Sequence, residues 1–229
     1  MTFAKLRVWL DDHPGTLGTL ASLIGGHDGD VVGIDVLERG AGRVIDELVV
    51  QIPHPDVIDE IAATLAATRG IDVESAVTLP GPLPDPRVDA LELASQLLAQ
   101  LDVDPLLRTL SEATRLQFRA QWSIVMDPVA PSPLAFSGKP PPVRWLASFV
   151  AGARLATSAD GPRDVAWAPL DLSELVLLLG RNGEPFRDRE RRQLTALGRI
   201  ADHRWTELTR SSHPSNRLNP IRARVLSEV

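Results

Sequence analysis

The sequence predicts two α+β domains in succession, and three observations support this fold class. Strand and helix periodicities alternate up to residue 79, four prolines then fall within residues 80–86, and helical and strand-like patterns resume afterwards. The chain has 229 residues, of which 44% are hydrophobic and 24% charged, as in ordinary globular proteins. A chain of this length has room for two domains, each with its own core.

The first domain, residues 1–79, begins with a strand followed by a helix. Apolar and polar residues alternate from Lys5 to Leu10, which predicts a strand with one buried face. Apolar residues then recur at helical spacing from Leu17 to Ile24, and a Gly25-Gly26 pair ends that helix. This strand and this helix are joined by the short segment that carries the candidate site.

The rest of the first domain predicts a hairpin, a helix and a last strand. The hairpin strands are Asp30–Glu38 and Val44–Ile52, and the second helix runs from Val57 to Leu65, before Gly70. Ile71–Leu79 is the last strand. The order is that of the split βαβ, ferredoxin-like arrangement, in which both helices cover one face of a four-stranded antiparallel sheet. Because the other face is then uncovered, we expect it, or the edges beside it, to pair with a second copy in a homodimer.

Residues 80–87, PGPLPDPR, are expected to be a semi-rigid linker, because proline is excluded from helix interiors and central strands. The second domain, residues 88–208, is again α+β. Its expected helices are Leu91–Leu101, Leu106–Phe118, Val143–Leu155 and Asp188–Thr209, and its expected strands are Trp122–Met126, Ala166–Ala168 and Glu174–Gly180. The proline-rich stretch 127–142 reads as a long connection and residues 209–229 as a tail.

Composition excludes several classes of protein. The absence of cysteine removes disulfides, thiolate catalysis and cysteine-bound metals. With no apolar run of eighteen residues and no signal peptide, we expect a cytoplasmic protein without a membrane partner. The net charge of -6 makes nucleic acid an unexpected main partner. Residues 181–229, however, contain eleven arginines and six acidic residues, a net charge of 11 − 6 = +5. This leaves open the alternative that a basic region contacts nucleic acid or an acidic partner.

The segment that joins the first strand to the first helix carries the candidate site. Pro14-Gly15 opens the helix, so the amides of Gly15, Thr16 and Leu17 lie among the unsatisfied donors of its first turn, where a carboxylate is favoured. Asp12 lies just before the helix, where its carboxylate could accept a hydrogen bond from an amino group. A simpler interpretation explains the same residues, with Asp12 as an N-cap and Pro14 as a favoured first-turn residue.

The pattern D-x-P-G-x-L, followed after one helix by Gly29 and a β-branched strand, resembles the ACT domain over residues 3–80. ACT domains are regulatory modules that bind amino acids, often between two copies. The resemblance implies that the ligand lies against one loop and against the start of the second strand of the neighbouring copy. The implied ligand-binding residues are Asp12, His13, Pro14, Gly15, Thr16 and Leu17, with Asp30, Val31 and Val32.

The chain departs from this family at Val31, where many amino-acid-binding members have asparagine. We therefore expect an apolar or small amino acid as ligand; alternatively, the module keeps only its dimerisation role. In the second domain, residues 175–205 and the helices at 91–118 resemble a GAF-type sensory domain. Such domains bind small molecules or dimerise through their terminal helices.

No catalytic or nucleotide-binding motif is present, since G-x-S-x-G, H-E-x-x-H, the P-loop and G-x-G-x-x-G are all missing. We therefore expect a non-enzymatic signalling protein without metal or other cofactor, in which an ACT-like domain exerts allosteric regulation through a GAF-like domain. Two alternatives remain: an enzyme with an active site in the second domain, and a transcription-associated regulator that uses the basic C-terminal region.

Overall fold

The structure is a computed structural model that describes residues 2–81, 85–155 and 163–212. Within these ranges the chain forms six helices and eight strands, and the strands make two antiparallel four-stranded sheets. The mixed α+β class is therefore confirmed. The predicted tail falls mostly outside the described residues, but its first residues, 209–212, belong to the last helix.

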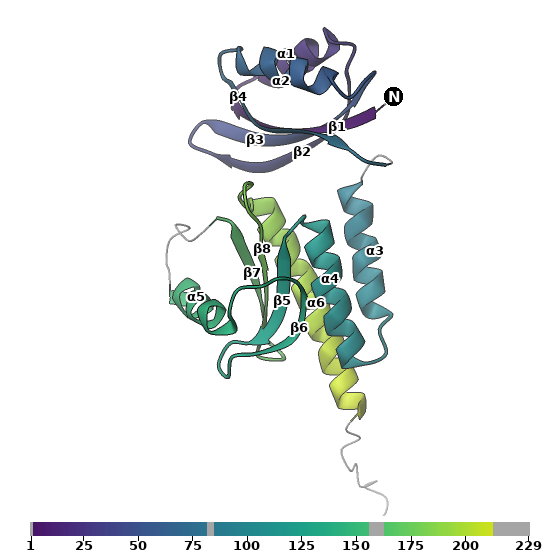
Figure 1. The fold of residues 1–229 in the computed structure, drawn as a ribbon, viewed down its shortest axis with the longest axis vertical. Helices are drawn as coiled ribbons and strands as arrows, with labels where there is room; N and C mark the ends of the chain where they lie inside the picture. Colours follow the sequence, from purple (N-terminus) through teal and green to yellow (C-terminus); the bar gives the residue numbers. More distant parts are fainter. Residues whose placement is uncertain (1, 82–84, 156–162, 213–229) are drawn as a thin grey trace, which may run out of the picture. The chain divides into compact units, whose positions relative to one another are not determined.

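The chain divides into two compact units (Figure 1). The first consists of Met1–Pro86 together with Arg187–Arg192, and the second of Arg87–Phe186 together with Gln193–Val229. Each unit is described by itself below.

The sheet of the first unit has the strand order β2-β3-β1-β4, with antiparallel neighbours throughout. Because β1 and β2 both run antiparallel to β3, they are parallel to each other, and β2 and β4 are the two edges of the sheet. The four strands predicted from periodicity are all present. Their bounds are β1 Thr2–Asp11, β2 Asp30–Gly40, β3 Arg43–Ile52 and β4 Ile71–Leu79.

Helices α1 (Thr16–Gly25) and α2 (Val57–Ala66) lie on one face of this sheet (Figure 1). The buried residues of α1 recur at every fourth position, so one side of the helix packs on the sheet. That side shares a core with alternate strand residues such as Val8 and Leu48. In β1 and β3 the even-numbered residues therefore face the helices, and the odd-numbered residues face away.

The other face of the sheet carries buried charges. Lys5 and Arg7 on β1 have only 6% and 2% of their surface exposed. Arg187, from the Arg187–Arg192 segment of the same unit, pairs with Glu74 on β4, and Arg189 pairs with Asp35 on β2. The expectation of an uncovered face is thus wrong for this unit. Alternation predicts which residues point to this face, but it does not show which distant segment supplies their counter-charges.

In the second unit the sheet order is β6-β5-β8-β7, again with antiparallel neighbours. The central strand β8 is buried along its whole length because helices cover both faces of the sheet. The strands are β5 Trp122–Asp127, β6 Ser132–Gly138, β7 Val165–Leu170 and β8 Leu175–Gly180.

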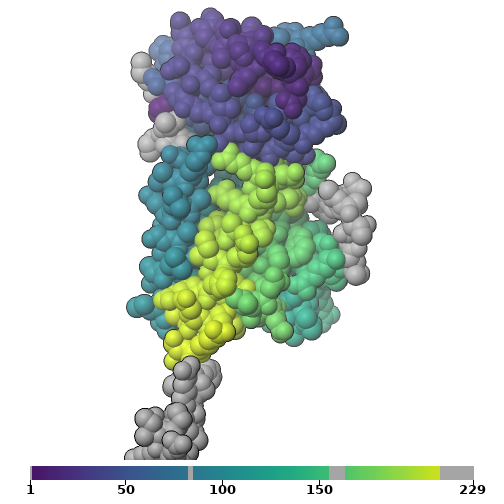
Figure 2. All heavy atoms as spheres, turned by 180° about the vertical axis from the view of Figure 1, so that it is seen from behind, coloured from purple at the N-terminus to yellow at the C-terminus, as the bar shows by residue number. Residues whose placement is uncertain are grey.

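Helices α3 (Pro86–Leu98), α4 (Val103–Gln117) and α6 (Asp188–Ser212) contribute to the core on one face of the second sheet, and α5 (Val143–Leu155) to the core on the other. In the space-filling view α3 and α6 run side by side (Figure 2). Arg204 of α6 joins them by donating to the carbonyl of Gln100, just after α3.

Three of the differences from the sequence-based expectation involve prolines. Strand β6 lies inside stretch 127–142; it is an edge strand, and Pro133 sits at a register shift where a missing N–H is tolerated. Helix α4 begins at Val103, with Pro105 in its first turn, and α3 begins at Pro86, within the predicted linker. First-turn N–H groups have no partner inside the helix, so proline loses nothing there.

Candidate ligand-binding site

The segment between β1 and α1 is held in place by backbone hydrogen bonds from two neighbouring turns. The N–H of Asp11 donates to the carbonyl of Gly70 over 3.1 Å, and the N–H of Asp12 donates to the carbonyl of Gly42 over 2.9 Å. Gly42 lies in the β2–β3 turn. The loop is therefore anchored at the end of the sheet where β1 and β2 finish.

Helix α1 begins without a side-chain cap. Its N-cap residue is Gly15, no side chain bonds to the first turn, and no acid lies in that turn. Within the described residues, no acceptor contacts the N–H groups of Gly15, Leu17 and Gly18. Helix N-termini usually gain a side-chain acceptor or an acid, so these donors and the positive end of the helix dipole are available to an anion.

Gly15 has a φ of +96°, a conformation that other residues adopt only with strain. A Cβ atom built at Gly15 would have no heavy atom within 4 Å, so the space beside the first turn is open. The glycine is therefore required by the backbone angle, and the open space would accommodate a ligand.

The loop side chains have distinct environments. Asp12, His13, Pro14 and Leu17 are exposed, whereas Thr16 is buried and is the first α1 residue to face the sheet. The hydroxyl of Thr16 lies 2.9 Å from Nδ1 of His13. Asp12 is not the helix cap, because that position belongs to Gly15. Its exposed carboxylate is free of the capping role that the simpler interpretation gave it.

The structure separates the two predicted halves of the site within one chain. Asp30 pairs with Gln51, which pairs with Phe3, so the start of β2 lies beside the start of β1. The Asp12–Leu17 loop follows the other end of β1. The side chain of Val31 packs against the core of its own unit. Asp30, Val31 and Val32 therefore do not meet the loop of the same chain.

One residue at the site was missed by sequence reasoning. Asp46 on β3 pairs with Val8 of β1 and Val36 of β2, which places it on the helix-covered face of the sheet. Only 4% of its surface is exposed, and its Oδ1 has no hydrogen-bond partner among the described residues. The signal was present in the sequence, because Asp46 is in phase with Val44, Leu48, Val50 and Ile52 in a strand of alternating burial.

Burial raises the pKa of the Asp46 carboxyl above its usual value. The guanidinium of Arg39 opposes this rise in pKa, and the carboxylate of Asp12 adds to it. The influence of Asp12 means that the two carboxylates are electrostatic neighbours, one exposed in the loop and one buried beneath the helices.

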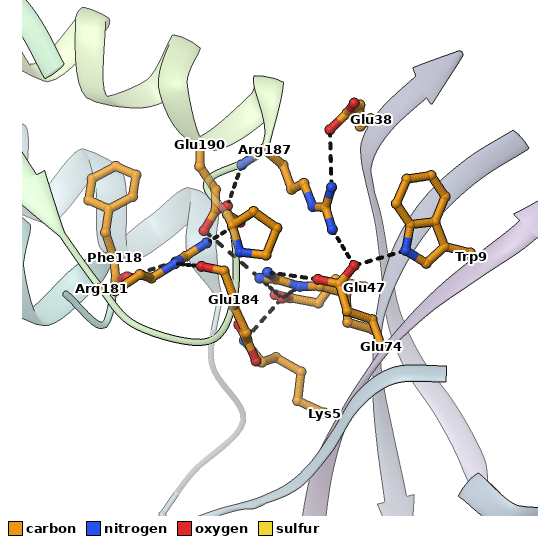
Figure 3. A network of polar contacts seen from close by, with 12 residues as sticks. Lys5, Trp9, Glu38, Glu47, Glu74, Phe118, Arg181, Glu184, Arg187 and Glu190 are labelled. Atoms are coloured by element: carbon orange, nitrogen blue, oxygen red, sulfur yellow. Dashed lines mark hydrogen bonds and ion pairs between the residues drawn. The ribbon is translucent and has the colours of Figure 1, made fainter. Parts of the chain in front are cut away.

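On the opposite face of the sheet, charged side chains pair with other side chains of the protein (Figure 3). Glu47 accepts from Nη2 of Arg7 over 2.7 Å and lies 3.0 Å from Nζ of Lys5. Glu74 accepts from the indole N–H of Trp9 over 2.9 Å and pairs with Arg187. These partners belong to the protein itself, so we interpret this network as structural.

Burial raises the pKa of Glu47, but Lys5 and Arg7 lower it more, and the net pKa lies below the usual value. Asp46 and Glu47 are adjacent in the chain, yet their pKa values shift in opposite directions. The difference follows from the face of the sheet that each occupies.

Two buried polar residues of the second unit, Arg181 and Asp202, have structural partners. Arg181 donates to the carbonyls of Phe118, Glu184 and Pro185 (Figure 3). Asp202 accepts hydrogen bonds from the backbone N–H groups of Leu172 and Ser173. These contacts hold loops in position. Because Arg181 and Asp202 are engaged with backbone groups, we interpret both residues as structural and not as parts of a ligand site.

Within the part of the chain that the structure describes, no group of three or more metal-ligating side chains occurs, and no helix is long and apolar enough to cross a membrane. No protein-family model matches the sequence, and no curated protein matches it. Among solved structures, an unknown protein from Galdieria sulphuraria is similar over 88% of this chain and 92% of its own, with 11% identity and a TM-score of 0.30. A similarity this weak carries no argument about fold or function.

Proposed function

We propose that the protein is an amino-acid-responsive regulatory protein whose first domain binds an amino acid at the start of α1 and passes this signal to the second domain. One observation carries the proposal: the uncapped first turn of α1, with open space at Gly15, follows directly after the exposed carboxylate of Asp12. The N–H donors of the helix suit the carboxylate of an amino acid, and the neighbouring carboxylate suits its ammonium group, so the site suits a zwitterion.

The arrangement of the first unit supports its assignment to the ACT-like, ferredoxin-like class. The strand order β2-β3-β1-β4 and the placement of both helices on one face are those expected of that arrangement. The GAF-like assignment of the second domain is supported by a sheet between the helices α3, α4 and α6 and the helix α5.

A homodimer formed along β2 would complete the site. Since β2 is an edge strand, antiparallel pairing with β2 of a second copy would bring the start of one β2 beside the end of the other. That end lies next to Gly42, which anchors the Asp12 loop. Asp30, Val31 and Val32 of one copy would then lie near Asp12–Leu17 of the other.

The amino-acid site is tested by titration calorimetry of the whole protein against each of the twenty amino acids. We expect saturable binding of at least one, weakened about 10- to 100-fold in Asp12→Asn, because a charge-assisted hydrogen bond contributes about 1.5–3 kcal/mol. Asp59→Asn, an equal charge change on α2, is the matched control and retains full affinity. Absence of binding by every amino acid, or equal affinity in Asp12→Asn, would contradict the proposal.

Gly15→Val is a less informative variant than Asp12→Asn. Its side chain would fill the open space, but a β-branched residue at a φ of +96° also strains the backbone. Loss of binding in that variant would therefore not distinguish a blocked site from a distorted helix start.

A further inference from the structure

Asp46 is a buried carboxyl group that no other feature of the first unit uses. Its environment on the helix-covered face is apolar, since its partners across the sheet are Val8 and Val36. A buried oxygen that lacks a hydrogen-bond partner costs free energy, so such a group is rare unless something else occupies its lone pairs. The fold therefore retains a destabilising residue at this position.

The charged surroundings of Asp46 are few. Its own face of β1 carries no ionisable residue, and α1 carries none along its whole length. Helix α2, which packs on the same face, carries Asp59 and Glu60, and both are exposed. The β1–α1 loop supplies Asp12 and His13, and β2 supplies Arg39, which is exposed. No cation in the described residues forms an ion pair with Asp46, in contrast to Glu47 on the other face.

We propose that Asp46 is the second carboxylate of the binding site and that, together with Asp12, it accepts hydrogen bonds from the ammonium group of the bound ligand. This inference rests on the proposed function and adds to it a ligand class. A positively charged amino group is favoured, because two carboxylates that face one position disfavour a ligand with a neutral or negative group there.

In acid, binding also moves a proton. At a pH where free Asp46 carries a proton, the charge of the arriving ammonium group favours the ionised form of Asp46, so the carboxyl O–H bond breaks and the proton leaves to the buffer. The ligand keeps its own protons, and the complex holds a carboxylate against an ammonium. Affinity therefore rises with pH through the range in which free Asp46 is protonated.

The test compares the wild-type protein with Asp46→Asn, which preserves the shape of the side chain and removes its charge. The probes are the twenty amino acids, the simple amines methylamine and isobutylamine, and the 2-hydroxy acid counterpart of each amino acid that binds, such as lactate for alanine. Calorimetry is run in acid and at neutral pH, each in two buffers of different ionisation enthalpy, because a proton released in acid makes the measured enthalpy depend on the buffer.

We expect Asp46→Asn to bind about 10-fold or more weakly and to lose the buffer dependence. Its thermal midpoint without ligand should be equal to or above that of the wild type, which separates a binding role from a structural one. If Asp46→Asn fails to fold, Asp46→Ser and the buffer dependence of the wild type decide the question.

Other outcomes discriminate between the two proposals. Amino acids that bind both proteins equally, or 2-hydroxy acids that bind as tightly as amino acids, would overturn the role of Asp46 and leave the amino-acid site standing. Amines that bind through Asp46 without any amino acid would overturn the proposed function alone. Binding of no probe would overturn both, and Ca²⁺ or Mg²⁺ binding abolished in Asp46→Asn would replace the ammonium by a metal ion.

Discussion

Asp46 and Glu47 show at the scale of single residues how a β-strand gives neighbours opposite chemistry. Because successive side chains point to opposite faces, Asp46 lies in the apolar layer under the helices and Glu47 lies among cations. Burial dominates for Asp46 and raises its pKa, whereas Lys5 and Arg7 lower that of Glu47.

These two shifts predict opposite dependences of stability on pH. The pKa of Glu47 is lower in the folded protein, so its contribution is full above the usual pKa of glutamate and is lost as the pH falls through the folded-state value. Glu47→Gln should therefore be about 1–3 kcal/mol less stable than the wild type near neutral pH, and the difference should shrink in acid.

For Asp46 the sign is reversed, because its pKa is higher in the folded protein. The folded protein holds the proton more tightly, so stability is lost as the pH rises from the usual aspartate pKa through the folded-state value. Asp46→Asn should match the wild type in acid and exceed it near neutral pH. Urea unfolding of both variants across pH measures these differences, and equal pH profiles for the two would contradict the assignment of faces.

Sequence reasoning could place side chains on faces but could not find their partners. The alternation of β1 and β3 predicted both faces of the sheet, and the Pro-Gly start of α1 predicted an open helix terminus. Neither pattern indicated that Arg187, more than a hundred residues from Glu74, would pair with it. Asp46 was missed because an acid in phase with the core was treated as part of an ordinary strand.

At the scale of elements, prolines and glycines decide where strands and helices begin and how closely they approach. The proline-rich stretch 127–142 was read as a connection because proline is rare in central strands, yet an edge strand accepts it and β6 forms there. By contrast, the helix Val143–Leu155 was predicted with its bounds intact, because its apolar period is long and Pro142 precedes it.

Gly180 shows a close approach that only glycine allows. A Cβ atom at this end of β8 would lie 2.2 Å from ring atoms of Trp122 on β5. Gly180→Ala should therefore destabilise the second unit by about 1–3 kcal/mol, as overpacking of a core does.

Gly152→Ala on α5, where a Cβ atom meets nothing within 4 Å, should instead stabilise the protein by about 0.5–1 kcal/mol. Thermal unfolding of both variants measures the effects, and a neutral Gly180→Ala would contradict the packing.

At the scale of the whole molecule, the proposed regulation requires two copies, because one chain does not bring Asp30–Val32 to the Asp12 loop. A ligand held between two copies favours the dimer by its differential affinity for that state. Its binding and the association of the chains should therefore strengthen each other.

Charge placed on the β2 edge should separate these copies. Ile34 on β2 is 39% exposed, and Val77 on the opposite edge strand, β4, is 38% exposed. We expect Ile34→Glu to weaken self-association and ligand affinity together, because a charge blocks strand pairing at an edge. Val77→Glu should change neither. Sedimentation with and without amino acid measures this, and equal effects of the two variants would contradict pairing along β2.

The most direct test of the central claim is the response of the α1 backbone amides to amino-acid titration in an NMR spectrum of the whole protein. Binding at the start of the helix predicts that the N–H signals of Gly15, Leu17 and Gly18 shift most, since these donors have no acceptor in the described residues. In Asp12→Asn the same shifts should need a higher amino-acid concentration. Shifts that leave these three amides unchanged, or that concentrate in the second unit, would contradict the account.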